Sequence, residues 1–285
     1  MPAYKHPVQI SSPLLDSYLA RLVLAGVTPA TLRAKKVALD MFGRFIAPRD
    51  LIEATRADCE RWLTDRPLMP ESRRTYRSHL RGLYTWAWEE GLVPEDVTVR
   101  IPKVRVARRT PRPMPQADLD RALASADRRM KAWLLLGALA GLRCLEIAGL
   151  RPQDLQHTPD GVLLYLRLCK GGGSASVPAH AMILEALAAV PIRNGLWWEC
   201  LPQTVSATIN EYLRELGIAS NAHSLRHYAG TAFYKYSGHD LLTTQALLRH
   251  QSVSSTQIYA ATDPTRPREV VDLVPLRLVD PGAVA

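Results

Sequence analysis

The sequence predicts a mostly α-helical chain with one small antiparallel β-sheet, in which an all-helical domain precedes an α+β domain. Apolar residues recur at helical spacing through most of the 285 residues. Only residues 162–168 show the alternation of a strand, and a glycine-rich turn follows them. A basic, proline-containing segment separates the two parts. We therefore place the domains at 1–95 and 113–285, with a linker at 96–112.

The first domain is predicted to hold four helices. The first has apolar residues at helical spacing, namely Leu14, Leu15, Tyr18, Leu19 and Leu22. The second begins at Thr28-Pro29, because Thr is a favoured N-cap and Pro fits the first turn. The third covers 56–64 behind the cap Thr55, and the fourth runs from about residue 70 to 90, where Gly91 ends it.

The second domain begins with two predicted helices, at 116–126 and 129–149. The alternating residues of the strand that follows are Val162, Leu164, Leu166 and Leu168. Lys170 then opens a Gly-Gly-Gly turn, and residues 175–178 supply the return strand. From His180 onward the pattern is helical again, with breaks at Gly195, Gly217, Ser220 and Gly238.

The charge of the chain indicates a polyanionic partner. Lys and Arg number 36 against 27 Asp and Glu, a net charge of +9. Residues 1–112 hold 20 basic and 12 acidic side chains, a net of +8, so residues 113–285 keep only 16 and 15, a net of +1. A basic half joined to a nearly neutral half favours nucleic acid, with an anionic membrane surface as the alternative.

A membrane-spanning role is not supported. The most apolar run, Trp133 to Leu142, has ten residues, whereas a span needs about 20. Residues 1–10 lack the apolar core of a signal peptide. The four cysteines form no CxxC pair, which argues against a zinc site and suits free thiols in a reducing cytosol. We expect no metal and no cofactor.

Two arginine-rich places in the first domain and the linker are candidate DNA contacts. The fourth helix carries arginines four residues apart, which repel one another unless an anion lies between them. A solvated charged face is the alternative. The linker has six basic residues from 100 to 112 and no acid, so it can lie along a phosphate backbone. The predicted DNA-binding residues are Arg33, Lys36, Arg73, Arg74, Arg77, Arg81, Lys103, Arg105, Arg108 and Arg109.

Residues 141–259 contain an ordered series of motifs. Gly141-Leu142-Arg143-Cys144-Leu145-Glu146 comes first, followed by Lys170, His223-Ser224-Leu225-Arg226-His227, His250 and, nine residues later, Tyr259. In this order and spacing the chain resembles the tyrosine recombinase (phage integrase) family. The resemblance covers the whole second domain, and the basic helical first domain looks like the family's core-binding domain. It implies an all-α core-binding domain followed by an α+β tyrosine-recombinase catalytic domain.

The resemblance implies the catalytic set Arg143, Lys170, His223, Arg226, His250 and Tyr259, supported by Glu146. Tyr259 would attack a phosphodiester and conserve the bond energy as a phosphotyrosyl ester. Two guanidiniums would stabilise the charge of the transition state. Lys170 would protonate the leaving 5′-oxygen. The sequence leaves open which of His223 and His250 handles the tyrosine proton.

Each assignment has a structural alternative. A salt bridge to Glu146 could account for Arg143, a helix cap at Ser220 or Asn221 for His223, and ordinary packing for Tyr259. We expect His227 to be structural, and His180 and His239 to lie on the surface. Many members of the family have Gly before the second histidine, where this chain has Arg249.

Four functions fit this pattern. The preferred one is a site-specific recombinase of the integrase type, compact and without an arm-binding domain ahead of residue 11. The others are a chromosome or plasmid dimer resolvase, a type IB topoisomerase and a catalytically silent DNA-binding protein. The expected partners are double-stranded DNA with paired recombination sites, and three further copies of the chain, joined through residues 260–285. We expect the protein on the nucleoid, in the cytoplasm of a bacterial host.

Overall fold

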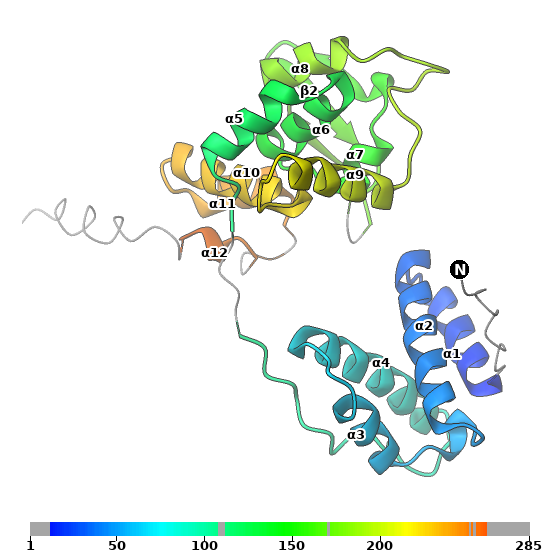
Figure 1. Cartoon of the computed structure of the whole chain (residues 1–285). Helices are drawn as coiled ribbons and strands as arrows, with labels where there is room; N and C mark the ends of the chain where they lie inside the picture. The colour runs from blue at the N-terminus through cyan, green and yellow to red at the C-terminus, as the bar shows by residue number, and fades with distance from the viewer. Residues whose placement is uncertain (1–11, 108–111, 170–171, 251, 253–254, 261–285) are drawn as a thin grey trace, which may run out of the picture. The chain divides into compact units, whose positions relative to one another are not determined.

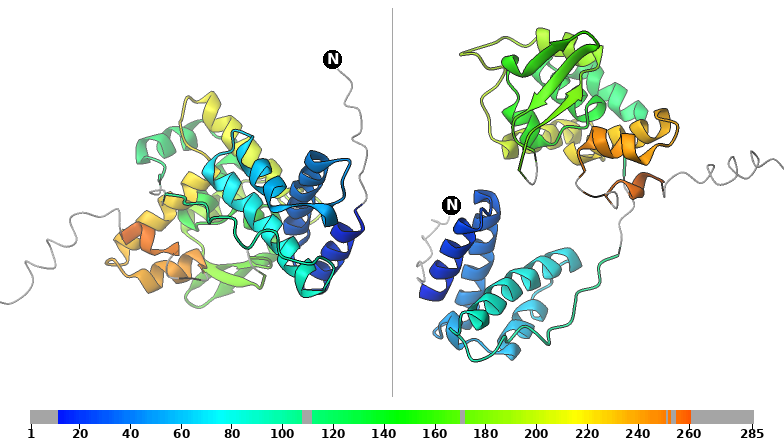
Figure 2. Two further views of the ribbon diagram at one scale, coloured as in Figure 1. Left: turned by 90° about the horizontal axis from the view of Figure 1, so that it is seen from below. Right: turned by 180° about the vertical axis from the view of Figure 1, so that it is seen from behind.

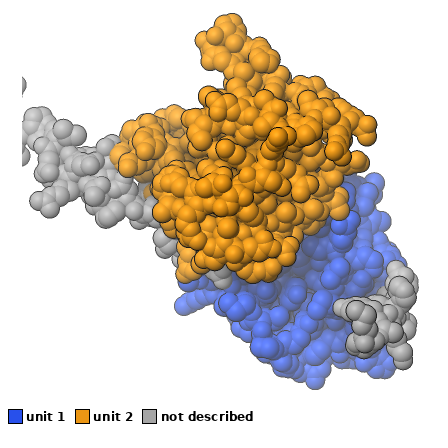
Figure 3. Space-filling view, turned by 45° about the horizontal axis from the view of Figure 1, so that its top comes forward, with its two compact units in different colours: residues 1–108 blue, residues 109–285 orange. Residues whose placement is uncertain are grey.

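A computed structural model describes residues 12–107, 112–169, 172–250, 252 and 255–260 of the chain (Figure 1). The chain divides into two compact units, residues 1–108 and 109–285, which Figure 3 colours separately. The division falls inside the segment that we assigned to the linker. Each unit has its own apolar core, so each is described by itself.

The first unit is helical throughout its described part. Its elements are α1 (Pro13–Leu24), α2 (Pro29–Ile46), the 3-10 helix η1 (Leu51–Glu53), α3 (Arg56–Thr64) and α4 (Pro70–Glu89). The predicted caps are present, because the side chains of Thr28 and Thr55 accept from the backbone N–H groups of Thr31 and Asp58. All four predicted helices are therefore present, and the bounds of α3 and α4 lie within one residue of the predicted ones.

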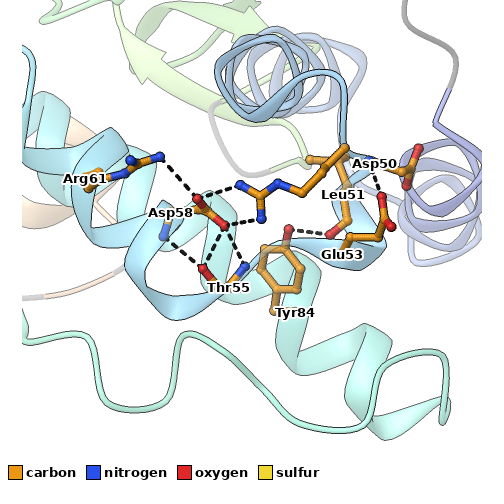
Figure 4. Close-up of polar contacts among 8 residues, drawn as sticks. Asp50, Leu51, Glu53, Thr55, Asp58, Arg61 and Tyr84 are labelled. Atoms are coloured by element: carbon orange, nitrogen blue, oxygen red, sulfur yellow. Dashed lines mark hydrogen bonds and ion pairs between the residues drawn. The ribbon is translucent and has the colours of Figure 1, made fainter.

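Aromatic side chains hold these helices together. Phe42 of α2 and Trp62 of α3 are almost fully buried, with ring centroids 5.2 Å apart. Tyr84 of α4 is also buried and donates a hydrogen bond of 2.8 Å to the carbonyl of Leu51. These contacts link α2, η1, α3 and α4 around one core, and Figure 4 shows the bond between Tyr84 and Leu51.

A buried carboxylate fixes the start of α3. Asp58 is 4% exposed, and its two oxygens accept from both terminal nitrogens of Arg49 at 2.8 and 2.9 Å (Figure 4). It also accepts from the backbone N–H and the hydroxyl of Thr55. The Arg49 guanidinium, helped by Thr55, holds the pKa of the Asp58 carboxyl well below its ordinary value.

We expected the basic segment after α4 to be separate from the first core, but it contributes one residue to that core. Ile101 is 5% exposed and belongs to that core. Its carbonyl accepts two hydrogen bonds from the Arg77 guanidinium, at 2.6 and 3.1 Å. The first core therefore includes Ile101, which lies inside the segment predicted as the linker at 96–112.

The second unit combines helices with one small sheet (Figure 2). Its helical elements are α5 (Gln116–Ser125), α6 (Arg128–Leu139), α7 (Cys144–Gly149), the 3-10 helix η2 (Pro152–Asp154), α8 (Ala181–Ala188), α9 (Pro202–Glu215), α10 (Ala222–Tyr236), α11 (Leu241–Leu248) and α12 (Gln257–Ala260). Its strands are β1 (Leu155–Thr158), β2 (Gly161–Leu166) and β3 (Ala175–Pro178). Helix α6 is central, since it packs against α7, α8, α9 and α10.

The sheet is antiparallel with the order β1-β2-β3. Leu164 lies opposite Leu155 on one side and Val177 on the other, and Leu164 and Val177 are buried. The hairpin of β2 and β3 matches the prediction, whereas β1 was missed because its residues Gln-His-Thr show no apolar alternation. Leu168 lies beyond β2 and is 57% exposed, so the predicted strand was too long.

The predicted helix at 129–149 is wrong as a single element. The chain leaves helical geometry between Leu139 and Cys144, where Gly141 has φ +58°. A Cβ atom at this position would lie 2.9 Å from the Leu248 side chain, so both the backbone angle and the space demand glycine. The loop between α6 and α7 becomes the centre of the site described below.

In the described part of the chain, no helix is long and apolar enough to cross a membrane.

Replacing Asp58 with Asn should destabilise the first unit by about 1–3 kcal/mol, because a buried, charge-assisted hydrogen-bond set loses its anion. The carboxyl pKa is lowered by folding, so its stabilisation is present above pH about 4 and is lost as the pH falls further. Thermal unfolding of the full chain should therefore show a difference between wild type and D58N at pH 7 that shrinks toward pH 2. The matched control Glu89→Gln, at an exposed carboxylate, should leave the midpoint unchanged. A constant difference across this pH range would contradict the assignment.

Candidate active site

One face of α10 carries the central residues of the site. His223, Arg226, His227 and Gly230 follow the spacing i, i+3, i+4, i+7, which places them along one side of a helix. The helix begins at Asn221, whose side-chain oxygen accepts from the backbone N–H groups of His223 and Ser224 at 2.9 and 3.1 Å. The cap thus holds the first histidine at the first turn of the helix.

Arg226 joins three elements. It is 3% exposed, and its two terminal nitrogens donate to the carbonyls of Gly141 and Leu248. Gly141 lies in the loop between α6 and α7, and Leu248 ends α11. Burial, together with the nearby charges of Arg143 and Arg249, lowers the pKa of Arg226 to about 9. The guanidinium is therefore a cation held in the interior, where an anion would stabilise it.

Arg143 is the N-cap residue of α7 and remains partly accessible. Its backbone N–H donates to Glu146 Oε2 at 2.8 Å, and its guanidinium donates to Glu146 Oε1 at 3.2 Å. The Arg143 side chain is 22% exposed and that of Glu146 is fully buried. The ion pair that we considered as the alternative to a catalytic role is thus present, and it leaves part of the guanidinium accessible.

Tyr259 lies in α12 and packs against α10 (Figure 1). It is 2% exposed, and a Cβ atom added to Gly230 would overlap its ring. Its hydroxyl lies 3.4 Å from Nδ1 of His227. Burial raises the pKa of Tyr259, while the positive charges of Arg226 and Arg143 act in the opposite direction. The phenol thus lies beside a ring nitrogen and in the field of two guanidiniums.

Two histidines in this cluster are held neutral. His250 hydrogen-bonds through Nδ1 to Thr256 Oγ1 at 2.9 Å. Burial, and then the neighbouring arginines, lowers the pKa of His250 to about 4. Burial, and then His223 and Arg226, lowers that of His227 to about 4. Both rings are therefore neutral near pH 7, so each has a ring nitrogen that can accept a hydrogen bond or a proton.

The structure brings together most of the predicted catalytic residues. The charges of Arg143 and Arg226 act on both His250 and Tyr259. His223 meets His227 edge to face, with ring centroids 4.5 Å apart. Lys170 lies outside the described residues. Of the other histidines, His180 is exposed as predicted and caps α8, while His239 is half-buried against Tyr234.

Within the described ranges, no group of His, Cys, Asp or Glu side chains is arranged to hold a metal ion. Cys59, Cys144, Cys169 and Cys200 are free thiols.

The predicted DNA-binding residues of the first unit fall into two kinds. Arg33, Arg74, Arg81, Lys103 and Arg105 are exposed. Three others have partners inside the unit: Lys36 pairs with Asp40, Arg73 donates to the Leu63 carbonyl, and Arg77 binds the Ile101 carbonyl. Arg108 and Arg109 lie outside the described residues. The arginine stripe of α4 is therefore partly a structural device, which its spacing alone did not indicate.

Three residues of the site were not predicted as functional. His227 was expected to be structural, yet its Nδ1 lies 3.4 Å from the Tyr259 hydroxyl. Arg249 was noted only as a departure from the family pattern. Gly230 was not noted, although a glycine inside a helix is costly and signals a close approach.

Comparison with known proteins decides the family. The model described as Phage integrase family matches residues 199–266. The tyrosine recombinase XerD of Pseudomonas putida is 28% identical in an alignment of 293 positions that covers 91% of this chain and 94% of the relative. The tyrosine recombinase XerC of Pseudomonas entomophila is 34% identical in an alignment of 212 positions that covers 65% of this chain and 68% of the relative. The chain belongs to the tyrosine recombinase family.

Solved structures agree with this assignment at the level of the fold. A lambda integrase dimer bound to a core site superposes with a TM-score of 0.71 at 18% identity, covering 85% of this chain and 95% of that one. The XerH recombinase bound to palindromic difH gives 0.68 at 18% identity, covering 87% and 81%. The predicted family and the predicted mostly helical fold class are confirmed, and the protein is a site-specific recombinase.

The stability of the recombinase should fall as the pH is lowered from 7.5 to 5. His227 and His250 have an ordinary pKa near 6.5 when unfolded and about 4 when folded. Their contribution is therefore present above pH 6.5 and is lost as the pH falls toward 4. The thermal midpoint of the His227→Gln variant should drop less between these pH values than that of wild type. His157→Gln, at an exposed histidine, should behave like wild type; an equal drop in H227Q would contradict the assignment.

Gly230→Ala should impair DNA cleavage, although Gly→Ala inside a helix ordinarily adds about 1 kcal/mol of stability. The added Cβ would displace the Tyr259 ring from its place on α10. We expect single-turnover cleavage to slow by about tenfold or more with unchanged DNA affinity. In the control Gly43→Ala, the added Cβ would lie 3.7 Å from the Leu51 side chain, which is an ordinary van der Waals contact. This variant should therefore cleave normally. Wild-type cleavage by G230A would show that this ring position is dispensable.

Proposed function

We propose that this recombinase cleaves and rejoins double-stranded DNA through a covalent 3′-phosphotyrosyl intermediate on Tyr259, without metal or ATP. The observation that carries the proposal is a buried phenol that lies 3.4 Å from a neutral imidazole and within the field of two guanidiniums. Arg226 and His227 come from α10, Arg143 from the start of α7 and Tyr259 from α12. Residues more than 100 positions apart in sequence thus contribute to one electrostatic environment.

The arginines supply the charge that the reaction needs. Attack on a phosphodiester adds negative charge to the non-bridging oxygens, and preorganised cations at that position give the largest catalytic effect. Arg143 and Arg249 pair with one carboxylate, Glu146, and Arg226 lies in the same electrostatic environment, so these four side chains carry a net charge of +2. Arg143 is the partly exposed member and would contact the phosphate directly, together with Arg226.

The proton of the nucleophile has a short route. Tyr259 would lose its proton as it attacks, and His227 Nδ1 at 3.4 Å is a neutral acceptor. His223 meets His227 edge to face, and His250 lies in the field of Arg226 and Arg143. Both would bind the phosphate or share the proton. Lys170 would protonate the 5′-oxygen that leaves. The reverse sequence of transfers would rejoin the strand.

The partner we propose is a pair of DNA recombination sites, with strand exchange through a Holliday junction by a homotetramer whose copies exchange their C-terminal tails. A solved lambda integrase structure holds a tetramer on a Holliday junction, which supports this assembly by analogy. Basic side chains of the first unit, with Arg33, Arg74, Arg81, Lys103 and Arg105 exposed, would bind the backbone. The protein would act on the nucleoid, in the bacterial cytoplasm.

Among recombinases, we favour an integrase of a mobile element. A second candidate, a resolvase of chromosome or plasmid dimers, is supported by the similarity to XerD over nearly its whole length. The two differ in their DNA: an integrase joins two different molecules, whereas a resolvase acts on two copies of one site. Recombination assays with unlike and identical site pairs would separate them.

The covalent intermediate can be tested with nicked suicide substrates that carry candidate sites. Wild type should form a 3′-phosphotyrosyl adduct, insensitive to EDTA, and Tyr259→Phe should form none, because the nucleophilic oxygen is gone. The control Tyr236→Phe removes the hydroxyl of a tyrosine that is 83% exposed and should leave the adduct unchanged. Adduct formation by Y259F, or none by wild type on any DNA, would overturn the mechanism. Relaxation of supercoiled plasmid lacking paired sites would instead indicate a topoisomerase.

A further inference from the structure

Arg249 occupies a backbone position that ordinarily favours glycine. It follows the last residue of α11 with φ 54° and ψ 46°, the left-handed conformation of a helix C-cap. A residue with a side chain costs about 1 kcal/mol there relative to glycine. The contacts that the side chain makes must offset this cost, so they indicate what it does.

The Arg249 guanidinium reaches across to the loop between α6 and α7. Its side chain is 7% exposed, and Nη2 donates to Glu146 Oε2 at 2.9 Å and to the Gly141 carbonyl at 3.0 Å. Nη1 donates to the Leu247 carbonyl at 2.6 Å and to the Ala140 carbonyl at 3.3 Å. One side chain therefore binds the end of α11 to the residues that precede Arg143.

Glu146 is shared between two cations. Oε1 accepts from the Arg143 guanidinium, while Oε2 accepts from the Arg143 backbone N–H and from Arg249. The Glu146 side chain is fully buried, so its charge must be compensated within the protein. Among the described contacts, Arg143 would be the one guanidinium left on Glu146 if Arg249 were absent. The carboxylate would then hold the Arg143 guanidinium more tightly.

We propose that Arg249 is a positioning residue for the cleavage reaction and acts through Glu146 on Arg143. By compensating one oxygen of the carboxylate, it allows the Arg143 guanidinium to keep a single contact there and to direct its other N–H groups at the phosphate. It also ties His250, its neighbour in the chain, to the same loop. This inference rests on the proposed phosphoryl-transfer function, and it assigns a role to a residue that does not touch the DNA.

The inference can be tested with Arg249→Met in two backgrounds. On suicide substrates at saturating enzyme, R249M should slow single-turnover cleavage by about 10- to 100-fold, with DNA affinity unchanged. In the Glu146→Gln background the carboxylate no longer competes for Arg143, so adding R249M should cost less than about threefold. An equal cost in both backgrounds would show that Arg249 does not act through Glu146 and would overturn the proposal.

A substrate with a neutral methylphosphonate at the scissile position gives a readout that a purely structural role would not change. One non-bridging oxygen is lost, so stabilisation of its charge by Arg143 contributes less to the rate. The slowing caused by R249M should shrink to about threefold or less on this substrate. Equal slowing on both substrates would contradict the proposal.

Two further measurements separate misfolding from the proposed role. Thermal unfolding and DNA affinity identify a variant that fails to fold. If R249M does not fold, Arg249→Lys is used in its place, because it keeps the positive charge but lacks the planar guanidinium. Arg249→Lys should slow cleavage of the phosphodiester about three- to tenfold, and should slow it less in the E146Q background. Failure of wild type to form any adduct would refute the proposed function, whereas an adduct that forms equally fast in wild type and R249M would refute only this inference.

Discussion

The second unit depends on one arrangement, in which arginine side chains share a buried carboxylate and the carbonyls of the loop between α6 and α7. Glu146 receives Arg143 and Arg249, and the Gly141 carbonyl accepts from both Arg226 and Arg249. The loop carries the glycine that α11 packs against, α10 supplies Arg226, and α11 supplies Arg249. Without this shared set of hydrogen bonds, the loop, α10 and α11 would lose their common point of attachment.

The arrangement is electrostatically incomplete without an anion. Three guanidiniums and one carboxylate leave two positive charges in a partly buried place, where burial and then the neighbouring arginines lower the pKa of Arg226. A phosphodiester, and still more its transition state, would compensate these charges. Burial, and then the same positive surroundings, also lowers the pKa of His227 and His250, so both imidazoles stay neutral.

Much of this could be predicted from the sequence because the motifs are local. The spacing of His223 and Arg226 on one turn, the cap of α3 and the hairpin of β2 and β3 each depend on neighbouring residues. The break between α6 and α7 was missed, since the apolar pattern continues through it and only the left-handed glycine interrupts the helix. The roles of Gly230 and Arg249 could not be inferred, because each depends on a contact with a segment far away in the chain. For the same reason the internal partners of Arg73 and Arg77 were not foreseen.

The assembly of the site from distant segments has a consequence for the cell. Detachment of α11 would remove a carbonyl partner of Arg226, the second cation on Glu146 and the anchor of His250 together. Local opening would therefore take apart the charged cluster rather than leave it loosened but intact. In the proposed reaction, a newly made or partly unfolded chain would lack this cluster and would leave DNA uncut until the last helices had packed.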